Sequence, residues 1–238
     1  MGTAASMPPQ NNGFGGCVMR TACFIPIKEN SERIPGKNFK HLNNKKLYEY
    51  IIEHSLKAEC FDDIFIDTNS GEITEYAEAL GLKIIKRLEV LAANTANGND
   101  LLVYHYSIYP DYDCYFQLFA TAPFLQPETI KNCVHKLTEG EDYDSCFTVV
   151  KHHGFFWVNS HSVNYQPYVL PRSQDLEPVI EETTGLYGIK RGSLEKYRCR
   201  IGRKPYKYSV DKYEAVDINN ETDFKIAEII GKEYWKNE

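Results

Sequence analysis

The stretch that decides the fold follows a short apolar run and reads Ile25-Pro26-Ile27-Lys28-Glu29-Asn30-Ser31-Glu32-Arg33-Ile34-Pro35-Gly36-Lys37-Asn38. Residues 21–27 predict a buried strand, and a helical pattern begins near Leu47. Backbone N–H groups in a turn after a strand, together with the positive end of a following helix, attract anions. Arg33 and Lys37 add positive charge, so the stretch predicts a loop that holds a polyphosphate. An ordinary charged surface turn stays open as the alternative.

Composition bounds the class of protein. The chain has 238 residues, of which 42% are hydrophobic and 13% aromatic, enough to bury the core of one domain. Its formal net charge of −6 argues against non-specific binding to nucleic acid. An anionic substrate therefore needs a local basic patch. No apolar run approaches the length that crosses a membrane, so no membrane partner is expected.

The cysteines and the first residues suggest where the protein works. Seven cysteines, odd in number and without a Cys-x-x-Cys pair, indicate reduced core residues and a cytoplasmic protein. Residues 1–20 lack the pattern of a secretory signal and are expected to form a flexible leader before a domain at 21–238. The adjacent pair His152-His153 does not have the spacing of zinc ligands in a helix.

Strand-like and helical patterns alternate between residues 21 and 150, which predicts parallel strands joined by crossover helices. In such sheets ligands bind beyond the carboxyl ends of the strands. Residues 152–184 break the rhythm and are expected to extend off the sheet. The predicted strands are 21–27, 63–67, 82–86, 113–119, 145–150, 186–190 and 206–210, and the clearest helices are 47–59 and 221–231.

The loop resembles the opening of cytidylyltransferases that activate sialic acids and related 2-keto-3-deoxy sugar acids. That family has a strand and then Ile-Pro-Ala-Arg-Gly-Gly-Ser-Lys-Arg-Ile-Pro-Gly-Lys-Asn, and Ser31 and residues 33–38 match it position by position. The resemblance runs from about Cys23 to the final helix. It implies an α/β fold of three layers, a Rossmann-like nucleotidyltransferase with a mostly parallel sheet, in which about 152–184 form a small dimerisation extension.

The loop also departs from the family. Lys28 replaces the family's first Arg, Glu29-Asn30 replaces Gly-Gly, and Glu32 replaces a Lys. A carboxylate that faced the phosphates directly would repel them. Glu29 and Glu32 therefore either point to solvent or contact a metal or a substrate amine.

Other segments resemble the family's nucleotide and sugar contacts. Arg87 and residues 92–98 look like Arg-Pro-x-x-Leu-Ala-x-Asp-Thr-Ala-Ser-Ser, with Asn94 in place of the Asp. The resemblance implies that Arg87, Asn97 and Gly98 hold the base, since a pyrimidine edge needs donors and acceptors. For Arg87 a solvated charge at a strand end stays open.

Three residues are candidates for the acceptor substrate. Gln117 begins a stretch that looks like Gln-Pro-Thr-Ser-Pro-Leu-Arg, which implies a contact with a sugar. Arg172, in a stretch like Pro-Arg-x-Gln, corresponds to an Arg that pairs with the sugar acid's carboxylate in the neighbouring subunit. A solvated Arg in a loop stays open as the alternative. Lys151 precedes the extension and is a weaker candidate for binding an anion.

A last segment suggests a metal. Residues 215–224 look like the family's Ile-Asp-Ile-Asp-x-x-x-Asp-Leu, and in an extended segment Asp217 and Asn219 point to one side. Two such oxygens can bind Mg²⁺, although Asn219 replaces an Asp and removes a charge. Capping of the last helix is an equally good explanation for Asn219 and Asn220.

The resemblance implies transfer of CMP from CTP to the anomeric hydroxyl of a sialic-acid-like sugar acid, with release of pyrophosphate, by a homodimer. Lys28, Arg33 and Lys37 would be catalytic with Mg²⁺ by neutralising charge on the triphosphate, and Ser31 and Asn38 would hold the nucleotide. Two alternatives stay open. One is a nucleotidyltransferase for a different acidic sugar or a phosphorylated or phosphonylated molecule; the other is a non-catalytic nucleotide-binding relative.

Overall fold

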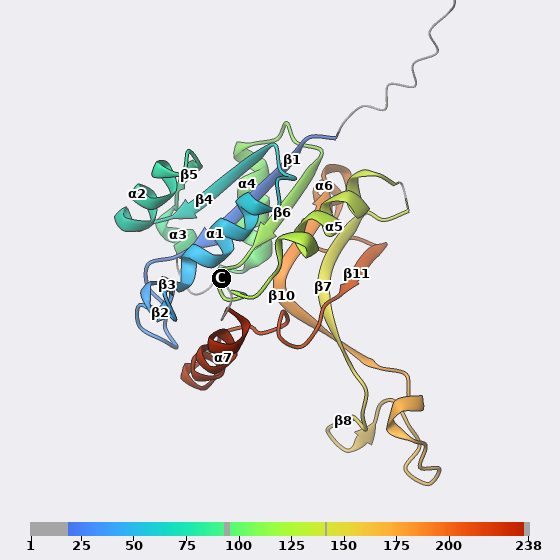
Figure 1. Cartoon of the computed structure of the whole chain (residues 1–238). Coiled ribbons are helices and arrows are strands. Elements are labelled where there is room, and N and C mark those ends of the chain that lie inside the picture. The colour runs from blue at the N-terminus through green and yellow to red at the C-terminus, as the bar shows by residue number, and fades with distance from the viewer. Residues whose placement is uncertain (1–18, 93–95, 141, 236–238) are drawn as a thin grey trace, which may run out of the picture.

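The computed structural model describes residues 19–92, 96–140 and 142–235. Its centre is a seven-stranded sheet (Figure 1). The strands of this sheet are β1 (Thr21–Ile27), β4 (Asp63–Thr68), β5 (Lys83–Lys86), β6 (Cys114–Leu118), β7 (Ser145–His152), β10 (Val179–Lys190) and β11 (Pro205–Ser209). Their order is β11-β7-β10-β6-β1-β4-β5. Because β10 alone runs antiparallel to its neighbours β6 and β7, the prediction of an α/β fold with a mostly parallel sheet is confirmed.

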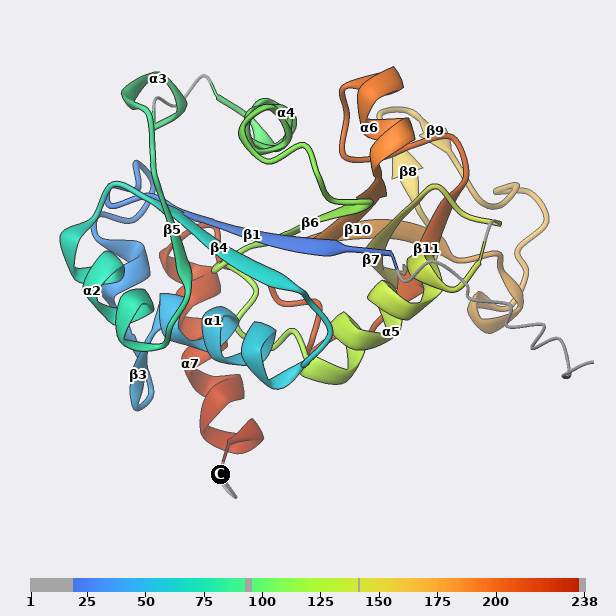
Figure 2. The same ribbon diagram turned by 90° about the horizontal axis from the view of Figure 1, so that it is seen from above.

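Helices cover both faces of the sheet and make three layers (Figure 2). One face carries α1 (Leu47–Lys57), α2 (Gly71–Ala79), α5 (Pro127–Thr138) and α7 (Glu221–Tyr234). The other carries α3 (Glu89–Ala92), α4 (Gly98–Ile108) and α6 (Arg191–Tyr197). Short elements complete the fold: the hairpins β2 (His41–Leu42) with β3 (Lys45–Lys46) and β8 (Trp157–Val158) with β9 (His161–Ser162), and the 3₁₀ turns η1 (Lys37–Phe39) and η2 (Ser173–Asp175).

The core is built around β1, whose side chains alternate between the two faces of the sheet. Cys23, Ile25 and Ile27 belong to a buried cluster with residues of α1 and α5. Ala22 and Phe24 belong to a second cluster with residues of β4 and α4. A strand buried on both sides explains the continuous apolar run in the sequence.

β10 is longer than the predicted strand 186–190, because it begins at Val179. Its pairing with β7 changes register between Glu182 and Tyr187, and Thr184 in between has a φ of 56°. Such an irregularity breaks the alternation that a sequence pattern depends on. Further along, a Cβ at Gly188 would lie 2.3 Å from the Phe116 ring, so the strand passes too close to β6 for a side chain.

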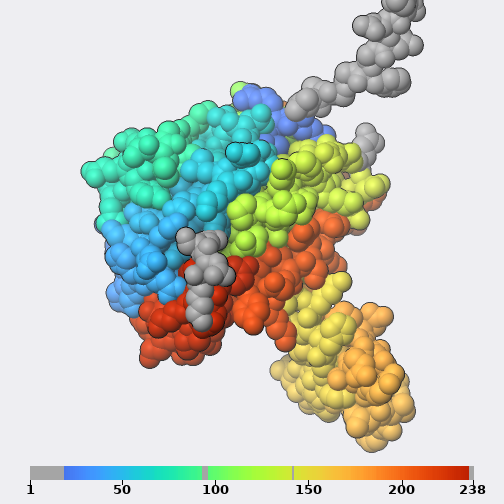
Figure 3. Space-filling model, viewed as in Figure 1, coloured from blue at the N-terminus to red at the C-terminus, as the bar shows by residue number. Residues whose placement is uncertain are grey.

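The segment 153–178, which we call the arm, joins β7 to β10 and projects from the body of the molecule (Figures 1 and 3). The ends of β7 and β10 form its stem, so the predicted extension 152–184 includes part of a sheet strand. Several apolar side chains of the arm are exposed, among them Trp157 (52%), Tyr168 (100%) and Leu170 (74%).

The predicted leader lies outside the described residues except for residues 19 and 20, and it stays a prediction. Within 19–92, 96–140 and 142–235, no helix combines the length and the apolar character needed to cross a membrane.

Candidate nucleotide site

The loop after β1 is held in shape by its own residues. The Asn38 side chain donates from Nδ2 to the Lys28 carbonyl, at 2.8 Å, and so closes the loop. Gly36 has a φ of 63°, a left-handed conformation that favours glycine. Ile34 is fully buried and packs with Leu42 and Leu47. These three anchors fix the shape of the loop.

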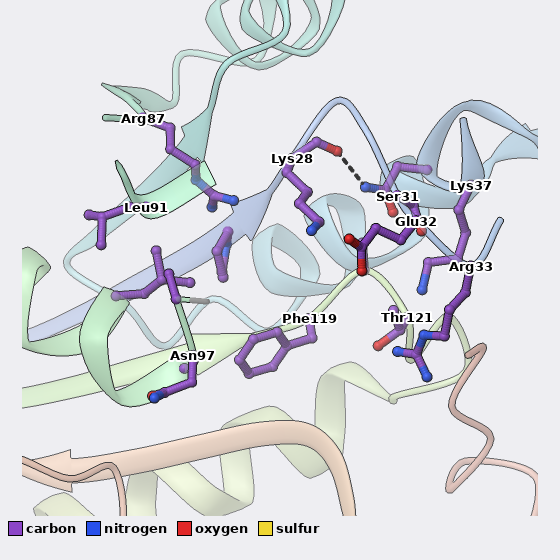
Figure 4. Close-up of a pocket in the computed structure, with 16 residues that line it drawn as sticks. Lys28, Ser31, Glu32, Arg33, Lys37, Arg87, Leu91, Asn97, Phe119 and Thr121 are labelled. Atoms are coloured by element: carbon purple, nitrogen blue, oxygen red, sulfur yellow. Dashed lines mark hydrogen bonds between the residues drawn. The ribbon is translucent and has the colours of Figure 1, made fainter. Parts of the chain in front are cut away.

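A cavity of about 420 Å³ lies against this loop at the carboxyl ends of β1, β5 and β6 (Figure 4). All the predicted nucleotide residues line it: Lys28, Ser31, Arg33, Lys37, Asn38, Arg87, Asn97 and Gly98. Phe119 and Thr121, which follow β6, complete its wall with Leu91 and Leu101. The structure therefore brings three distant segments together, while Asn94 lies outside the described residues.

Lys37 is the most buried cation of the loop, with 7% of the residue exposed. Its Nζ donates to the Ile218 carbonyl at 2.7 Å, which ties the loop to the segment before α7. Burial lowers the pKa of Lys37 to about 8, and the nearby charges of Arg33 and Lys28 act in the same direction against Asp217 and Asp223. An anion placed here would stabilise the protonated form.

The two acids of the loop lie differently. Glu29 is exposed and its N–H donates to Asn69 Oδ1 at 2.9 Å. Glu32 lines the cavity, and Figure 4 shows its carboxylate turned toward the end of Lys28. Solvent exposure, one of the two expectations, therefore fits Glu29. Glu32 is exposed as well, but it lies at the cavity, where its carboxylate moderates the positive charge around it.

At the other end of the cavity, Arg87 belongs to a buried network that sequence reasoning missed. Its Nε donates to Asp67 Oδ1 at 3.0 Å and its Nη2 to the Asp67 carbonyl at 2.9 Å. His105, from α4, contacts the second oxygen of Asp67 through Nε2 at 2.8 Å. Arg87 is only 7% exposed, which rules out the alternative of a solvated charge at a strand end.

Electrostatics fixes the charge states in this network. Burial alone would raise the pKa of Asp67, but hydrogen bonds from His105 and Arg87 outweigh it and hold the pKa below its ordinary value. Burial lowers the pKa of His105. Its Nδ1 has no partner among the described residues, which suits a neutral ring that donates from Nε2. The network is thus an Arg⁺–Asp⁻ pair steadied by a neutral imidazole.

Gly98 and Asn97 begin α4 beside the cavity. Asn97 Oδ1 accepts from the N–H groups of Asn99 and Asp100, so this side chain caps the helix. The fully buried Gln117 donates from Nε2 to the Gly98 carbonyl at 3.0 Å, and it is not among the lining residues. In this structure Gln117 supports the wall from behind, and its predicted contact with a sugar stays a prediction.

Asp217 and Asn219 line a second cavity, of about 560 Å³, next to the stem of the arm. Asn219 connects the two cavities, because its Oδ1 accepts from Arg33 Nη2 at 2.8 Å while its Nδ2 donates to Asp217 Oδ2. The other oxygen of Asp217 is buried and has no partner among the described residues. A carboxylate oxygen in that state suits a cation. The described residues hold no group of three or more His, Cys, Asp or Glu placed for a metal.

The two remaining predicted residues lie away from the first cavity. Lys151 is exposed on β7, opposite Ile180, where the strand leaves the body. The Arg172 side chain is 73% exposed in the arm and pairs with Asp175 at 2.7 Å. Neither residue is among those that line the loop cavity. A role in binding a sugar acid in the partner subunit stays a prediction for Arg172.

Comparison with known proteins identifies the family of this chain. A family model described as cytidylyltransferase matches residues 22–224. The chain belongs to the cytidylyltransferase family. N-acylneuraminate cytidylyltransferase A of Danio rerio is 27% identical over 215 residues, which are 87% of this chain and 50% of that protein. The N-acylneuraminate cytidylyltransferase of Escherichia coli O18:K1:H7 is 24% identical over 221 residues, or 88% and 52% of the two chains. The chain thus spans about half the length of these relatives.

Two solved structures agree on the fold. CMP:2-keto-3-deoxy-manno-octonic acid synthetase, in complex with CTP, superposes with a TM-score of 0.64 at 16% identity and covers 90% of this chain and 99% of that one. A 4-diphosphocytidyl-2C-methyl-D-erythritol synthase from Anaerococcus prevotii gives a TM-score of 0.64 at 11% identity, with 92% and 99% covered. The predicted family and Rossmann-like nucleotidyltransferase fold are therefore confirmed.

Asp67 offers a test of the buried network. Asp67→Asn leaves the Arg87 guanidinium buried without its counter-charge, so we expect the free energy of unfolding to fall by about 3–5 kcal/mol. Glu221→Gln is the control, because it removes the same charge from an exposed pair with Lys40 and should cost less than about 1 kcal/mol. Urea unfolding of both variants measures the difference. Equal losses would show that the network does not hold Arg87 as described.

Proposed function

We propose that the protein transfers CMP from CTP to the anomeric hydroxyl of a sialic-acid-like sugar acid, a nonulosonic or related 2-keto-3-deoxy acid, and releases pyrophosphate. The observation that carries the proposal is the convergence of Lys28, Arg33 and Lys37 on one cavity whose other end is Arg87 and the start of α4. The cationic end suits the triphosphate of a nucleotide, and the end at Arg87 and α4 suits its base. The relatives, which are named for acylneuraminate, support the acceptor class.

The chemistry follows from where the cations lie. The acceptor hydroxyl forms a bond to the α-phosphorus, its proton passes to solvent, and the bond between the α-phosphorus and the pyrophosphate oxygen breaks, so that pyrophosphate leaves. Lys28, Arg33 and Lys37 stabilise the negative charge that develops on the phosphates, without a covalent intermediate. Ser31 and Asn38 lie beside them to hold the nucleotide, and Arg87 with the backbone at 97–98 faces the base.

A screen for pyrophosphate release tests this function. It crosses the four common nucleoside triphosphates with N-acetylneuraminate and other 2-keto acids, and we expect release with CTP and a sugar acid. Lys37→Met should lower the rate at least about a hundredfold, because a buried donor to the triphosphate is lost. Lys40→Met is the control, because its ammonium pairs with Glu221 outside the cavity. No release with any pair would overturn the proposal.

The pKa of Lys37 gives the same experiment a second readout. With a pKa of about 8, Lys37 is largely neutral at about pH 8.5, and bound CTP should make it take up a proton. Calorimetric titration with CTP in buffers of different ionisation enthalpy measures that uptake. It should disappear in Lys37→Met and at about pH 6.5, where Lys37 is already charged.

We infer that Mg²⁺ takes part and that Asp217 would hold it, because the unpartnered buried oxygen of Asp217 fits a hard cation. When bound, the ion neutralises charge on the triphosphate. Asn219 lies beside Asp217, but its amide oxygen accepts a hydrogen bond from Arg33. Asp217 therefore contributes the negative charge of this pair.

Asn219→Asp tests this metal site. A second carboxylate next to Asp217 should lower the dissociation constant for Mg²⁺ on the order of tenfold. Calorimetric titration with MgCl₂, without nucleotide, measures the constant directly. Asn220→Asp is the control: it adds the same charge one residue along, where Asp caps a helix as well as Asn does. Equal effects of the two variants would contradict a site at Asp217.

We propose that the protein acts as a cytoplasmic homodimer in which the arm meets the partner subunit. The exposed apolar side chains of the arm support this, since a patch of this kind marks an interaction surface. The cysteines of the described residues are free thiols, which suits a reducing compartment.

The arm predicts the effect of single charges on assembly. Leu170→Arg places a charge on the arm surface and should turn the dimer into a monomer, as measured by light scattering. Val90→Arg is the control, with a similarly exposed side chain (69% against 74%) on α3. Dimers that survive Leu170→Arg, or a wild-type monomer, would contradict the proposed role of the arm.

A further inference from the structure

Arg200 lies in the turn between α6 and β11, outside every segment that the sequence singled out. Its backbone N–H donates to Asn99 Oδ1 at 3.0 Å, which fixes the turn against the first turn of α4. A Cβ at Gly98 would lie 2.5 Å from Arg200 Nη1, so the guanidinium packs directly on the glycine. Gly98 lines the nucleotide cavity, which puts Arg200 at its edge.

The guanidinium lies over an aromatic ring. Its Cζ lies 3.6 Å from the centre of the Tyr187 ring and 5.8 Å from that of Phe119, a lining residue. Tyr187 is 1% exposed, so this support is rigid. Stacking uses the face of the guanidinium and leaves the N–H donors at its edge.

No anion of the described residues balances this charge. The ion pairs that they form do not include Arg200. Glu182 accepts from the hydroxyl of the ring that Arg200 covers, at 2.8 Å, and not from Arg200 itself. An ordered, partly buried guanidinium with unused donors, next to a cavity, is suited to an anionic group of a ligand.

We propose that Arg200 binds the carboxylate of the acceptor, from the same chain that holds the nucleotide. This inference rests on the proposed function. Lys28, Arg33 and Lys37, which would meet the phosphates, lie across the cavity from Asn97 (Figure 4), so Arg200 is left to bind a second anion. The acceptor then lies against Phe119, and its acid group forms paired hydrogen bonds with the guanidinium edge. Arg172, by contrast, lies in the arm with Asp175 as its partner.

The test compares a carboxylate with its neutral ester. Pyrophosphate release is measured with CTP and N-acetylneuraminate or 2-keto-3-deoxy-manno-octonate, each as the free acid and as the methyl ester. In the wild type, kcat/KM for the ester should be roughly tenfold to a hundredfold lower than for the acid. In Arg200→Gln, kcat/KM for the acid should fall to the value for the ester. The value for the ester and the affinity for CTP should stay unchanged. Arg200→Lys, which keeps the charge on the ring but loses the fork, should fold as the wild type and keep part of the preference.

The controls separate the possible failures. Arg203→Gln removes an exposed arginine from the same turn and should keep the wild-type ratio of acid to ester. A wild-type ratio in Arg200→Gln, or a ratio lost in Arg172→Gln instead, would overturn the role of Arg200 and leave the proposed function standing. A wild type that releases no pyrophosphate with either acid would overturn the proposed acceptor class, and this inference with it.

Discussion

The buried ammonium of Lys37 is the constraint on which the arrangement of the site depends. A charge with 7% exposure needs a polar partner, and the Ile218 carbonyl supplies it. The backbone N–H of Ile218 donates to the Thr121 carbonyl at 2.9 Å. Residue 218 therefore holds the loop after β1 and the loop after β6 together. Together with the hydrogen bond from Arg33 to Asn219, this link fixes the segment before α7 beside the phosphate loop.

Burial of the same ammonium costs electrostatic free energy, and an anionic ligand can offset that cost. Its pKa of about 8 lies below the ordinary value of 10.5, so the folded protein disfavours the charged form. Below about pH 8 this cost opposes folding in full, and stability rises as the pH goes from about 8 toward 10.5, because the unfolded chain then binds more protons. A polyanion reverses the balance by favouring the charged form. A chain with a net charge of −6 thus concentrates positive charge where an anion belongs.

The sequence predicted those parts of the site that lie within a few residues of one another. Strand β1 and the loop from Lys28 to Asn38 follow from an apolar run and a motif, and α7 follows from its cap and its apolar face. Pairings across long distances could not be read in this way. Arg87 was recognised, but its partner Asp67 lies 20 residues before it in the sequence. His105 lies 38 residues after Asp67, and no spacing rule connects these three residues. Arg200 was missed because its significance comes from a ring on β10 and a glycine on α4.

Asn219 shows how a single replacement changes the meaning of a motif. An Asp at this position could accept from Arg33 but could not donate to Asp217, whereas the amide does both through its two ends. Turning the amide over would set its Nδ2 against the Arg33 guanidinium, so the arginine fixes its orientation. The neutral side chain of Asn219 therefore bridges Arg33 and Asp217 and prevents a direct ion pair between them. Because it occupies one oxygen of Asp217, only the other oxygen is open to a cation, so in the proposed metal site the replacement would fix where the ion binds and weaken the attraction for it.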